Sequence, residues 1–295
     1  MPSNDIATYV KQILTEKVQE PTSSVSFSSV GGGSINETYK ITTGGNRQFF
    51  IKINAAEKFP SLFKKEKNGL EFIGQKRIIK TPGAIDDAII NDKQVLLLDW
   101  IETGPRSASF WKTFGEQLAL LHHTSNDRFG FAEDNYMGAL PQRNSYTLLW
   151  TDFFIQHRLQ PQVSLAEQQG LLEPKYTDQF EMLYQKLDTI FNKENPSLLH
   201  GDLWSGNFMC DEQSQPVLID PAVYFGHRSV DLAMTTLFGG FDKTFYDAYR
   251  YHFPLPHNYH EQWNVSNLYP LLIHLNLFGS SYLHDIKTVL KKFIA

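Results

Sequence analysis

Four polar residues stand close together in the stretch LLHGDLWSGNFMCDEQSQPVLID, which runs from residue 198 to residue 220. They are His200, Asp202, Asn207 and Asp220. Short apolar runs at 208–210 and 217–219, separated by a polar turn that ends in proline, predict a β-hairpin. Antiparallel pairing would bring Asn207, just before the first strand, beside Asp220, just after the second. An amide oxygen and a carboxylate suit Mg²⁺, which takes oxygen ligands and borrows others from water and phosphate.

Asp202 precedes Asn207 by five residues, which is the spacing of the protein-kinase catalytic loop. In that loop the aspartate accepts the proton of the attacking hydroxyl, the asparagine holds a metal, and a second metal-binding aspartate follows downstream. The sequence therefore predicts phosphoryl transfer, with Asp202 as the base and with Asn207 and Asp220 as metal ligands. An acidic turn beside a strand is the simpler alternative, but four polar positions in register with a predicted hairpin favour a functional site.

The composition favours a soluble enzyme. The chain has 295 residues, a net charge of -5 and mixed charges throughout, so neither a nucleic-acid stripe nor a membrane-binding basic block is present. No apolar run approaches the roughly 18 residues of a membrane-spanning helix, and the N-terminus does not resemble a signal peptide. Cys210 is the only cysteine, which excludes an intramolecular disulfide and fits a reducing cytoplasm.

The first hundred residues predict a helix followed by short strands. Apolar residues from Ile6 to Val18 have helical spacing after a cap at Ser3 or Asn4. Strands are expected at 25–30, 38–42, 48–54 and 94–101. The glycine cluster at 31–36 between the first two strands is a flexible turn by default, although glycines also let backbone N–H groups approach phosphate. It matches neither the dinucleotide-binding nor the P-loop pattern.

Lys52 and Glu66 are a predicted ion pair. Lys52 alternates with apolar residues in the third strand, while Glu66 falls within the apolar stripe of a helix expected at 61–75. A carboxylate that faces a core needs a partner, because an unpaired buried charge is costly. In kinases a strand lysine and a helix glutamate pair in this way so that the lysine can hold the ATP phosphates.

A change to helical periodicity after the apolar strand at 94–101 predicts a lobe boundary near Glu102. The expected division is 1–101 for an ATP-binding lobe and 102–295 for a catalytic and acceptor-binding lobe. Helices are expected after Ser107 or Ser109 and over 150–159, 176–191 and 269–295. The backbone of the linker Asp99-Trp100-Ile101 would be free to hydrogen-bond an adenine edge, although a plain strand-to-helix connection explains the same residues.

With these residues in place, the chain resembles the fructosamine kinase (ketosamine-3-kinase) family, in the aminoglycoside phosphotransferase and choline kinase branch of the protein-kinase-like fold. The resemblance runs from about Val30 onward. It is most specific in HGDLWSGN at 200–207 and IDPAVYFGHRSVDLAM at 219–234, and is supported by GGGSIN at 31–36, FIKIN at 50–54, LLDW at 97–100 and WTDFFIQHRL at 150–159. It implies an α+β fold of two lobes, with a small β-rich N-lobe and a larger, mainly helical C-lobe.

The resemblance also implies an activity: Mg·ATP-dependent phosphorylation of sugar O3 in fructosamines and ribulosamines on free or protein-bound amines. The phosphate would then break down and release the amine, which is deglycation. Residues expected at the nucleotide are Gly31, Gly32, Gly33, Ser34, Lys52, Glu66, Asp99, Trp100 and Ile101. Asp202 would be the base, Asn207 and Asp220 the Mg²⁺ ligands, and Trp204 and His227 the substrate contacts. Asp231 and His200 would support the catalytic loop structurally.

Ser34 stands where several relatives carry a cysteine that acts as a redox switch, which puts such regulation in doubt here. Two alternatives stay open: a kinase of the same fold acting on an aminoglycoside, choline or a sugar, and a catalytically silent kinase-like binding module. No nucleic-acid or membrane partner is expected. The sequence does not give the physiological sugar, the amine or the oligomeric state.

Overall fold

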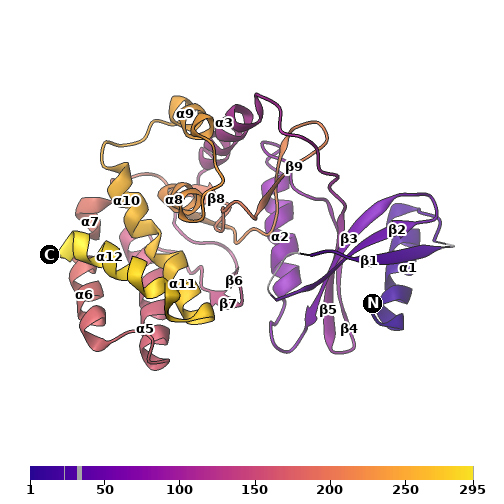
Figure 1. The fold of residues 1–295 in the computed structure, drawn as a ribbon, viewed down its shortest axis with the longest axis horizontal. Helices are drawn as coiled ribbons and strands as arrows, with labels where there is room; N and C mark the ends of the chain where they lie inside the picture. Colours follow the sequence, from indigo (N-terminus) through magenta and orange to yellow (C-terminus); the bar gives the residue numbers. More distant parts are fainter. Residues whose placement is uncertain (23, 32–34, 295) are drawn as a thin grey trace. The chain divides into compact units, whose positions relative to one another are not determined.

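The computed structural model describes residues 1–22, 24–31 and 35–294, which form two compact units. The N-terminal unit contains residues 1–105 together with 209–220, and the C-terminal unit contains 106–208 and the chain from Pro221 onward. Figure 1 shows that the first unit is built around a sheet and the second mainly from helices. The architecture is therefore α+β.

The sheet of the N-terminal unit is antiparallel, and its strands lie in the order β1-β2-β3-β5-β4. The strands are β1 (Val25–Ser29), β2 (Glu37–Thr43), β3 (Gln48–Ala55), β4 (Ala84–Ile90) and β5 (Lys93–Asp99). Four of them confirm the predicted strands within one or two residues, whereas β4 was not predicted. β4 lies at the edge of the sheet and its two aspartates interrupt the apolar alternation, so its strand pattern is weak.

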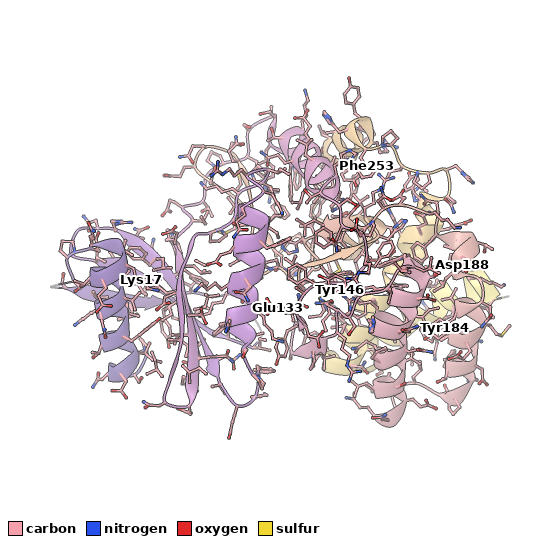
Figure 2. The ribbon with its side chains drawn as sticks, turned by 180° about the vertical axis from the view of Figure 1, so that it is seen from behind. Lys17, Glu133, Tyr146, Tyr184, Asp188 and Phe253 are labelled. Atoms are coloured by element: carbon pink, nitrogen blue, oxygen red, sulfur yellow. The ribbon has the colours of Figure 1, made fainter. Side chains whose placement is uncertain are left out.

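Helices α1 (Asn4–Val18) and α2 (Leu62–Gly74) cover opposite faces of this sheet (Figure 1). The Ser3 side chain accepts a hydrogen bond from the backbone N–H of Ile6, so the predicted N-cap is confirmed. Lys17 of α1, labelled in Figure 2, pairs with Asp86 of β4. Apolar residues of α1 share a core with Ile51 and Leu97. Because successive strand residues face opposite sides, Lys52 faces away from this core, on the side that α2 covers.

The predicted hairpin is confirmed, and most of it belongs to the N-terminal unit. Strands β9 (Phe208–Cys210) and β10 (Pro216–Leu218) pair with each other, and the second begins one residue earlier than expected. The backbone N–H of Leu218 donates to the carbonyl of Lys80, and the N–H of Gly104 donates to the carbonyl of Cys210. These bonds tie the hairpin to the loop before β4 and to the end of the first segment of the unit.

The C-terminal unit is mainly helical. Its helices are α3 (Phe110–His122), α4 (Trp150–Phe154), α5 (Gln160–Gln168), α6 (Pro174–Tyr184), α7 (Leu187–Ile190), α8 (Ser229–Leu237), α9 (Lys243–His252), α10 (Tyr259–Ser266), α11 (Leu268–Phe278) and α12 (Leu283–Ile294). Two short antiparallel pairs join them, β6 (Asn135–Met137) with β7 (Leu140–Gln142) and β8 (Ser197–Leu199) with β11 (Tyr224–Gly226). A continuous apolar core connects helices α4 to α8 with helices α10 to α12.

Three predicted helices differ from the structure in length or regularity. The expected helix at 150–159 passes from α4 into the π-helical segment η1 (Ile155–Leu159), where the fully buried Arg158 lies. The helix at 176–191 is divided into α6 and α7. The helix at 269–295 ends at Gly279, whose φ of 90° breaks the helical path before η2 (Ser280–Tyr282) and α12. Ala295 lies outside the described residues.

Candidate active site

Lys52 lies between two carboxylates in the N-terminal unit. Its Nζ donates to Glu66 Oε1 at 2.7 Å and to Asp220 Oδ1 at 2.7 Å. Strand β3 presents the lysine to α2, which carries Glu66, and Asp220 follows β10 at the end of the hairpin. The predicted Lys52–Glu66 ion pair is therefore present in the structure, and Asp220 completes a three-residue cluster.

The electrostatics of this cluster follow from its burial. The Lys52 side chain is 4% exposed and that of Glu66 11%, whereas Asp220 is 45% exposed. Burial alone would lower the pKa of Lys52, but the carboxylates of Asp220 and Glu66 outweigh it and hold that pKa above its usual value. Burial raises the pKa of Glu66, and Lys52 offsets this only in part. Lys52 is therefore a permanently charged ammonium group at the edge of the buried region.

Asp220 has a left-handed backbone, with φ of 53°. Non-glycine residues rarely adopt this conformation, and such strain concentrates at functional sites because the surrounding structure must maintain it. At the end of β10 the conformation lets the chain turn out of the strand, while the carboxylate reaches Lys52.

The glycine loop is described only in part. Gly31 is exposed, and a Cβ added to it would meet open space. The predicted nucleotide contacts Gly32, Gly33 and Ser34 lie outside the described residues. On the far side of the loop, Asn54 of β3 donates to the carbonyl of Ile35 at 3.0 Å and to Asn36 Oδ1 at 2.7 Å. Asn54 thus fixes the end of the loop, a role that sequence reasoning missed.

The predicted adenine-contacting linker begins at the last residue of β5. The backbone N–H of Asp99 donates to the carbonyl of Gly83 at 2.9 Å. The indole N–H of Trp100 donates to Glu102 Oε2, and the Lys40 ammonium lies 4.2 Å from the centre of the Trp100 ring. These contacts direct the Trp100 side chain over Lys40 of β2. Ile101 follows in the segment that connects β5 with the C-terminal unit.

In the C-terminal unit, Asp202 and Asn207 lie together as predicted for a kinase-like catalytic loop. The Asn207 side-chain Nδ2 donates to the Asp202 carbonyl at 2.8 Å and to Asp202 Oδ2 at 2.9 Å. Because the amide nitrogen is used in these bonds, the Asn207 Oδ1 atom is the one available as a ligand for a cation. The backbone N–H of Asp202 also donates to His200 Nδ1 at 3.2 Å, so His200 orients the loop.

Asp231 on α8 binds the backbone of this loop. Its carboxylate accepts from the backbone N–H of His200 at 2.7 Å and from that of Gly201 at 2.9 Å. It also lies 3.2 Å from His122 Nε2, and His122 Nδ1 lies 2.8 Å from the Tyr249 hydroxyl. Burial lowers the pKa of His122 despite the neighbouring carboxylate, so the ring is neutral, donates from Nε2 to Asp231 and accepts from Tyr249.

Trp204 is the exposed aromatic residue of the loop. Its indole covers Gly206, where an added Cβ would come 2.3 Å from the ring, and its ring packs edge-on against Phe238 at 5.8 Å. The side chain is 37% exposed. Gly206 is therefore required for the indole to lie flat against the loop, with part of the ring open to a ligand.

His227 does not have the exposure expected of a substrate contact. It is 1% exposed, its Nδ1 lies 2.8 Å from the Ser229 hydroxyl, and its ring packs against Trp150 and Phe191. Burial lowers its pKa to about 4. A side chain at this depth offers no surface to a substrate, which argues against the predicted contact and indicates a structural role. The neighbouring Arg228 is also buried and donates to the carbonyl of Phe253, which Figure 2 labels.

The structure brings the predicted residues together into one group in each unit. Lys52, Glu66 and Asp220 form one, and Asp202, Asn207 and Trp204 form the other. Among the described residues, no group of three or more His, Cys, Asp or Glu side chains could hold a metal ion by itself. Each group nevertheless contains a hard oxygen donor of the kind that Mg²⁺ prefers, the Asp220 carboxylate in one and the Asn207 amide oxygen in the other.

These features place the chain among the protein-kinase-like phosphotransferases. The crystal structure of a candidate fructosamine-3-kinase from Thermobifida fusca superposes with a TM-score of 0.86 at 29% identity and 98% coverage of both chains. A thermostable aminoglycoside phosphotransferase matches with a TM-score of 0.60, 15% identity and coverage of 97% of this chain and 99% of its own, a similarity of fold alone.

The chain belongs to the fructosamine kinase family, whose family model matches residues 6–295. A "Probable ketoamine kinase" of Lactiplantibacillus plantarum is 39% identical over 90% of this chain and 92% of its own length. The chloroplastic protein-ribulosamine 3-kinase of Arabidopsis thaliana is 33% identical over 96% of this chain and 86% of its own. No helix in the described residues is long and apolar enough to cross a membrane.

Proposed function

We propose that this protein transfers the γ-phosphoryl group of ATP to the O3 hydroxyl of the sugar in a ketosamine, such as a fructosamine or ribulosamine. The observation that carries this proposal is the buried Lys52, which lies 2.7 Å from both Glu66 and Asp220 in a member of the fructosamine kinase family. A buried ammonium group fixed by a helix glutamate is the feature that kinases use to anchor ATP phosphates. The names of the relatives support ketosamines as the acceptors.

On the nucleotide side, Lys52 binds phosphate oxygens and Glu66 keeps it in position. The backbone of Gly31, Gly32, Gly33 and Ser34 covers the phosphates, and the linker from Asp99 through Trp100 to Ile101 receives the adenine. Asn207 and Asp220 would hold Mg²⁺, which when bound neutralises charge on the phosphate groups.

On the acceptor side, Asp202 accepts the proton of the sugar O3 hydroxyl as the oxygen bonds to the γ-phosphorus. The bond from that phosphorus to the bridging oxygen breaks, and ADP leaves. Asn207 fixes the Asp202 carboxylate through its amide N–H. Trp204 offers its exposed indole to the sugar, since aromatic rings stack well against the apolar faces of sugar rings. Positioning and charge neutralisation supply most of the catalysis in such transfers.

The phosphorylated product would lose its sugar fragment spontaneously and release the free amine, which makes the net process deglycation. The acceptor is a small molecule or a protein-bound ketosamine, and no nucleic acid or membrane takes part. The use of ATP and the presence of a single, unpaired cysteine support a cytoplasmic location for this reaction.

The test is mass spectrometry of reactions containing Mg·ATP and either ribulosyl-lysine, fructosyl-lysine, kanamycin or choline. We expect a phosphorylated ketosamine and the appearance of free lysine, with no transfer to kanamycin or choline. The Asp202→Ala variant is the negative control, because loss of a general base costs on the order of 10²- to 10⁴-fold in rate.

Each alternative gives a different result. A phosphorylated antibiotic or choline without any phosphorylated ketosamine would replace the acceptor while leaving the kinase chemistry in place. No transfer to any acceptor, combined with thermal stabilisation by Mg·ATP, would favour the silent binding module.

A further inference from the structure

The catalytic loop in the C-terminal unit fits closely against the backbone of Ala222. Gly201 has a φ of 85°, and a Cβ at this position would come 2.0 Å from the carbonyl oxygen of Ala222. The Ala222 N–H donates to the carbonyl of His200 at 2.8 Å. Because the two backbones touch without clearance, the path of the loop up to Asp202 depends on where the Ala222 backbone lies.

Two buried side chains also donate hydrogen bonds to that backbone. Gln142 Nε2 donates to the carbonyl of Ala222 at 3.2 Å, and Asn135 Nδ2 donates to the carbonyl of Val223 at 2.8 Å. Asn135 and Gln142 face each other across the β6–β7 hairpin, and Gln142 Nε2 also donates to Asn135 Oδ1 at 2.8 Å. The short hairpin therefore presents a pair of amides to consecutive carbonyls of one segment.

The amide pair is itself fixed by a buried network. The Tyr269 hydroxyl of α11 donates to Gln142 Oε1 at 2.9 Å, and Asn144 Nδ2 donates to Asn135 Oδ1 at 3.1 Å. Arg158, fully buried in η1, donates to Asn144 Oδ1 at 2.7 Å. Such a network is rigid, because each member loses a costly hydrogen bond if its neighbour moves.

The network also lies within electrostatic reach of the catalytic loop. Burial raises the pKa of the Tyr269 phenol, and the negative charge of Asp202 acts in the same direction. Tyr269 thus links the network electrostatically to the base, although none of the bonds described above reaches Asp202.

We propose that Gln142 is a positioning residue for phosphoryl transfer. Together with Asn135, it holds the Ala222–Val223 backbone in the one place that supports the loop carrying Asp202. This inference rests on the proposed role of Asp202 as the base. A displacement of about 1 Å in a catalytic group can cost on the order of 10²-fold in rate, so a residue that acts only through the loop position can still control kcat.

The first test compares Gln142→Leu with Gln162→Leu. Leucine has nearly the volume of glutamine but makes no hydrogen bonds. Gln162 is a matched control, since it is also a buried glutamine of the C-terminal unit, and its amide bonds with Asn276 instead of with the loop. We expect Gln142→Leu to lower kcat about 10- to 100-fold with the KM for ATP within about twofold of the parent, and Gln162→Leu to leave kcat within about twofold.

A milder variant covers the case in which Gln142→Leu does not fold. Tyr269→Phe removes only the hydroxyl that fixes Gln142 Oε1, and we expect a smaller decrease in kcat with the same unchanged KM for ATP. Thermal melting of each variant separates positioning from stability. Equal decreases of kcat in Gln142→Leu and Gln162→Leu, or a kcat for Gln142→Leu and Tyr269→Phe within about twofold of the parent, would overturn the inference.

Failure of the proposed function would look different. Retention of turnover by Asp202→Ala would remove Asp202 as the base, whatever the Gln142 variants do. Loss of turnover in Asp202→Ala with full turnover in Gln142→Leu would leave the base assigned and refute only the positioning role.

Discussion

Replacing Glu66 by glutamine tests the role of the Lys52 cluster most directly. Glu66→Gln preserves the shape of the side chain and an oxygen that can accept the Lys52 hydrogen bond, but it removes the negative charge. Lys52 then keeps only one carboxylate partner, Asp220, at 2.7 Å. We expect the ammonium group to shift toward Asp220 and away from the position in which it would bind phosphate.

The size of the effect follows from burial and from the partners that remain. Removing one member of a buried ion pair costs about 3–5 kcal/mol when the other charge is left alone. Here Asp220 remains, glutamine still accepts a hydrogen bond, and the raised pKa of Glu66 shows that its charge is only partly compensated. The expected loss of unfolding free energy is therefore nearer that of one hydrogen bond to a charged group, about 1.5 kcal/mol.

The same substitution should also weaken the binding of ATP. Loss of one well-placed charged hydrogen bond to phosphate, about 1.4 kcal/mol, corresponds to a tenfold weaker affinity. Isothermal titration with Mg·AMP-PNP measures this affinity without turnover, and urea unfolding measures stability. Glu71→Gln is the matched control, because it makes the same chemical change on an exposed position of α2.

A nucleotide affinity for Glu66→Gln equal to that of Glu71→Gln would refute the anchoring role of the pair. A loss of stability above about 3 kcal/mol would refute the estimate itself, because it would mean that Asp220 does not compensate Lys52.

Three further outcomes are expected. Asp220→Ala should weaken nucleotide binding most at limiting Mg²⁺, because it removes the proposed metal ligand as well as a partner of Lys52; an affinity that is independent of Mg²⁺ in both parent and variant would contradict this. Trp204→Ala should raise the KM for ketosamine more than the KM for ATP, and equal changes in steady-state kinetics would exclude an indole contact with the sugar. Burial lowers the pKa of His227 to about 4 in the folded protein, whereas the same side chain has a pKa of about 6.5 in the unfolded chain. As the pH falls, His227 is therefore protonated first in the unfolded chain, and the folded protein loses stability between these two pH values. Lowering the pH from about 7 to about 5 should therefore reduce the free energy of urea unfolding less for His227→Leu than for the parent, by up to about 2 kcal/mol, and an equal loss would refute neutral burial of this ring.

Local patterns predicted much of the secondary structure around the site. The alternation of apolar residues about Lys52 and the Ser3 cap of α1 are properties of short segments, so they are visible in the sequence. The helices at 150–159 and 269–295 were less well predicted. A π-helical segment that contains a buried arginine, and a helix break at Gly279, depend on packing against distant segments, and periodicity alone does not reveal them.

Burial was the main quantity that the sequence did not supply. His227 and Trp204 stand in the same pair of motifs, yet one is enclosed by aromatic rings and the other is partly exposed. Asn54, His122 and Gln142 carry no sequence signal of their functions, because the groups that they bind are backbone atoms or residues far away in the chain. A glutamine in a short hairpin is ordinarily a surface residue.

The sequence by itself indicated phosphoryl transfer. That reaction needs a base, oxygen ligands for a metal ion and a fixed positive charge, and the sequence predicts these roles for Asp202, Asn207, Asp220 and Lys52 from their spacing. Only the tertiary structure decided how those groups are held. In the structure, residues 209–220 belong to the N-terminal unit. Asp220 therefore contacts Lys52, although the two residues are 168 positions apart in the sequence. The structure also shows that Asp231 bonds to the backbone of the catalytic loop and that Gln142 bonds to the Ala222 carbonyl beside it. Long-range contacts of this kind arise when apolar faces are buried together and buried polar groups find partners, which no local pattern encodes.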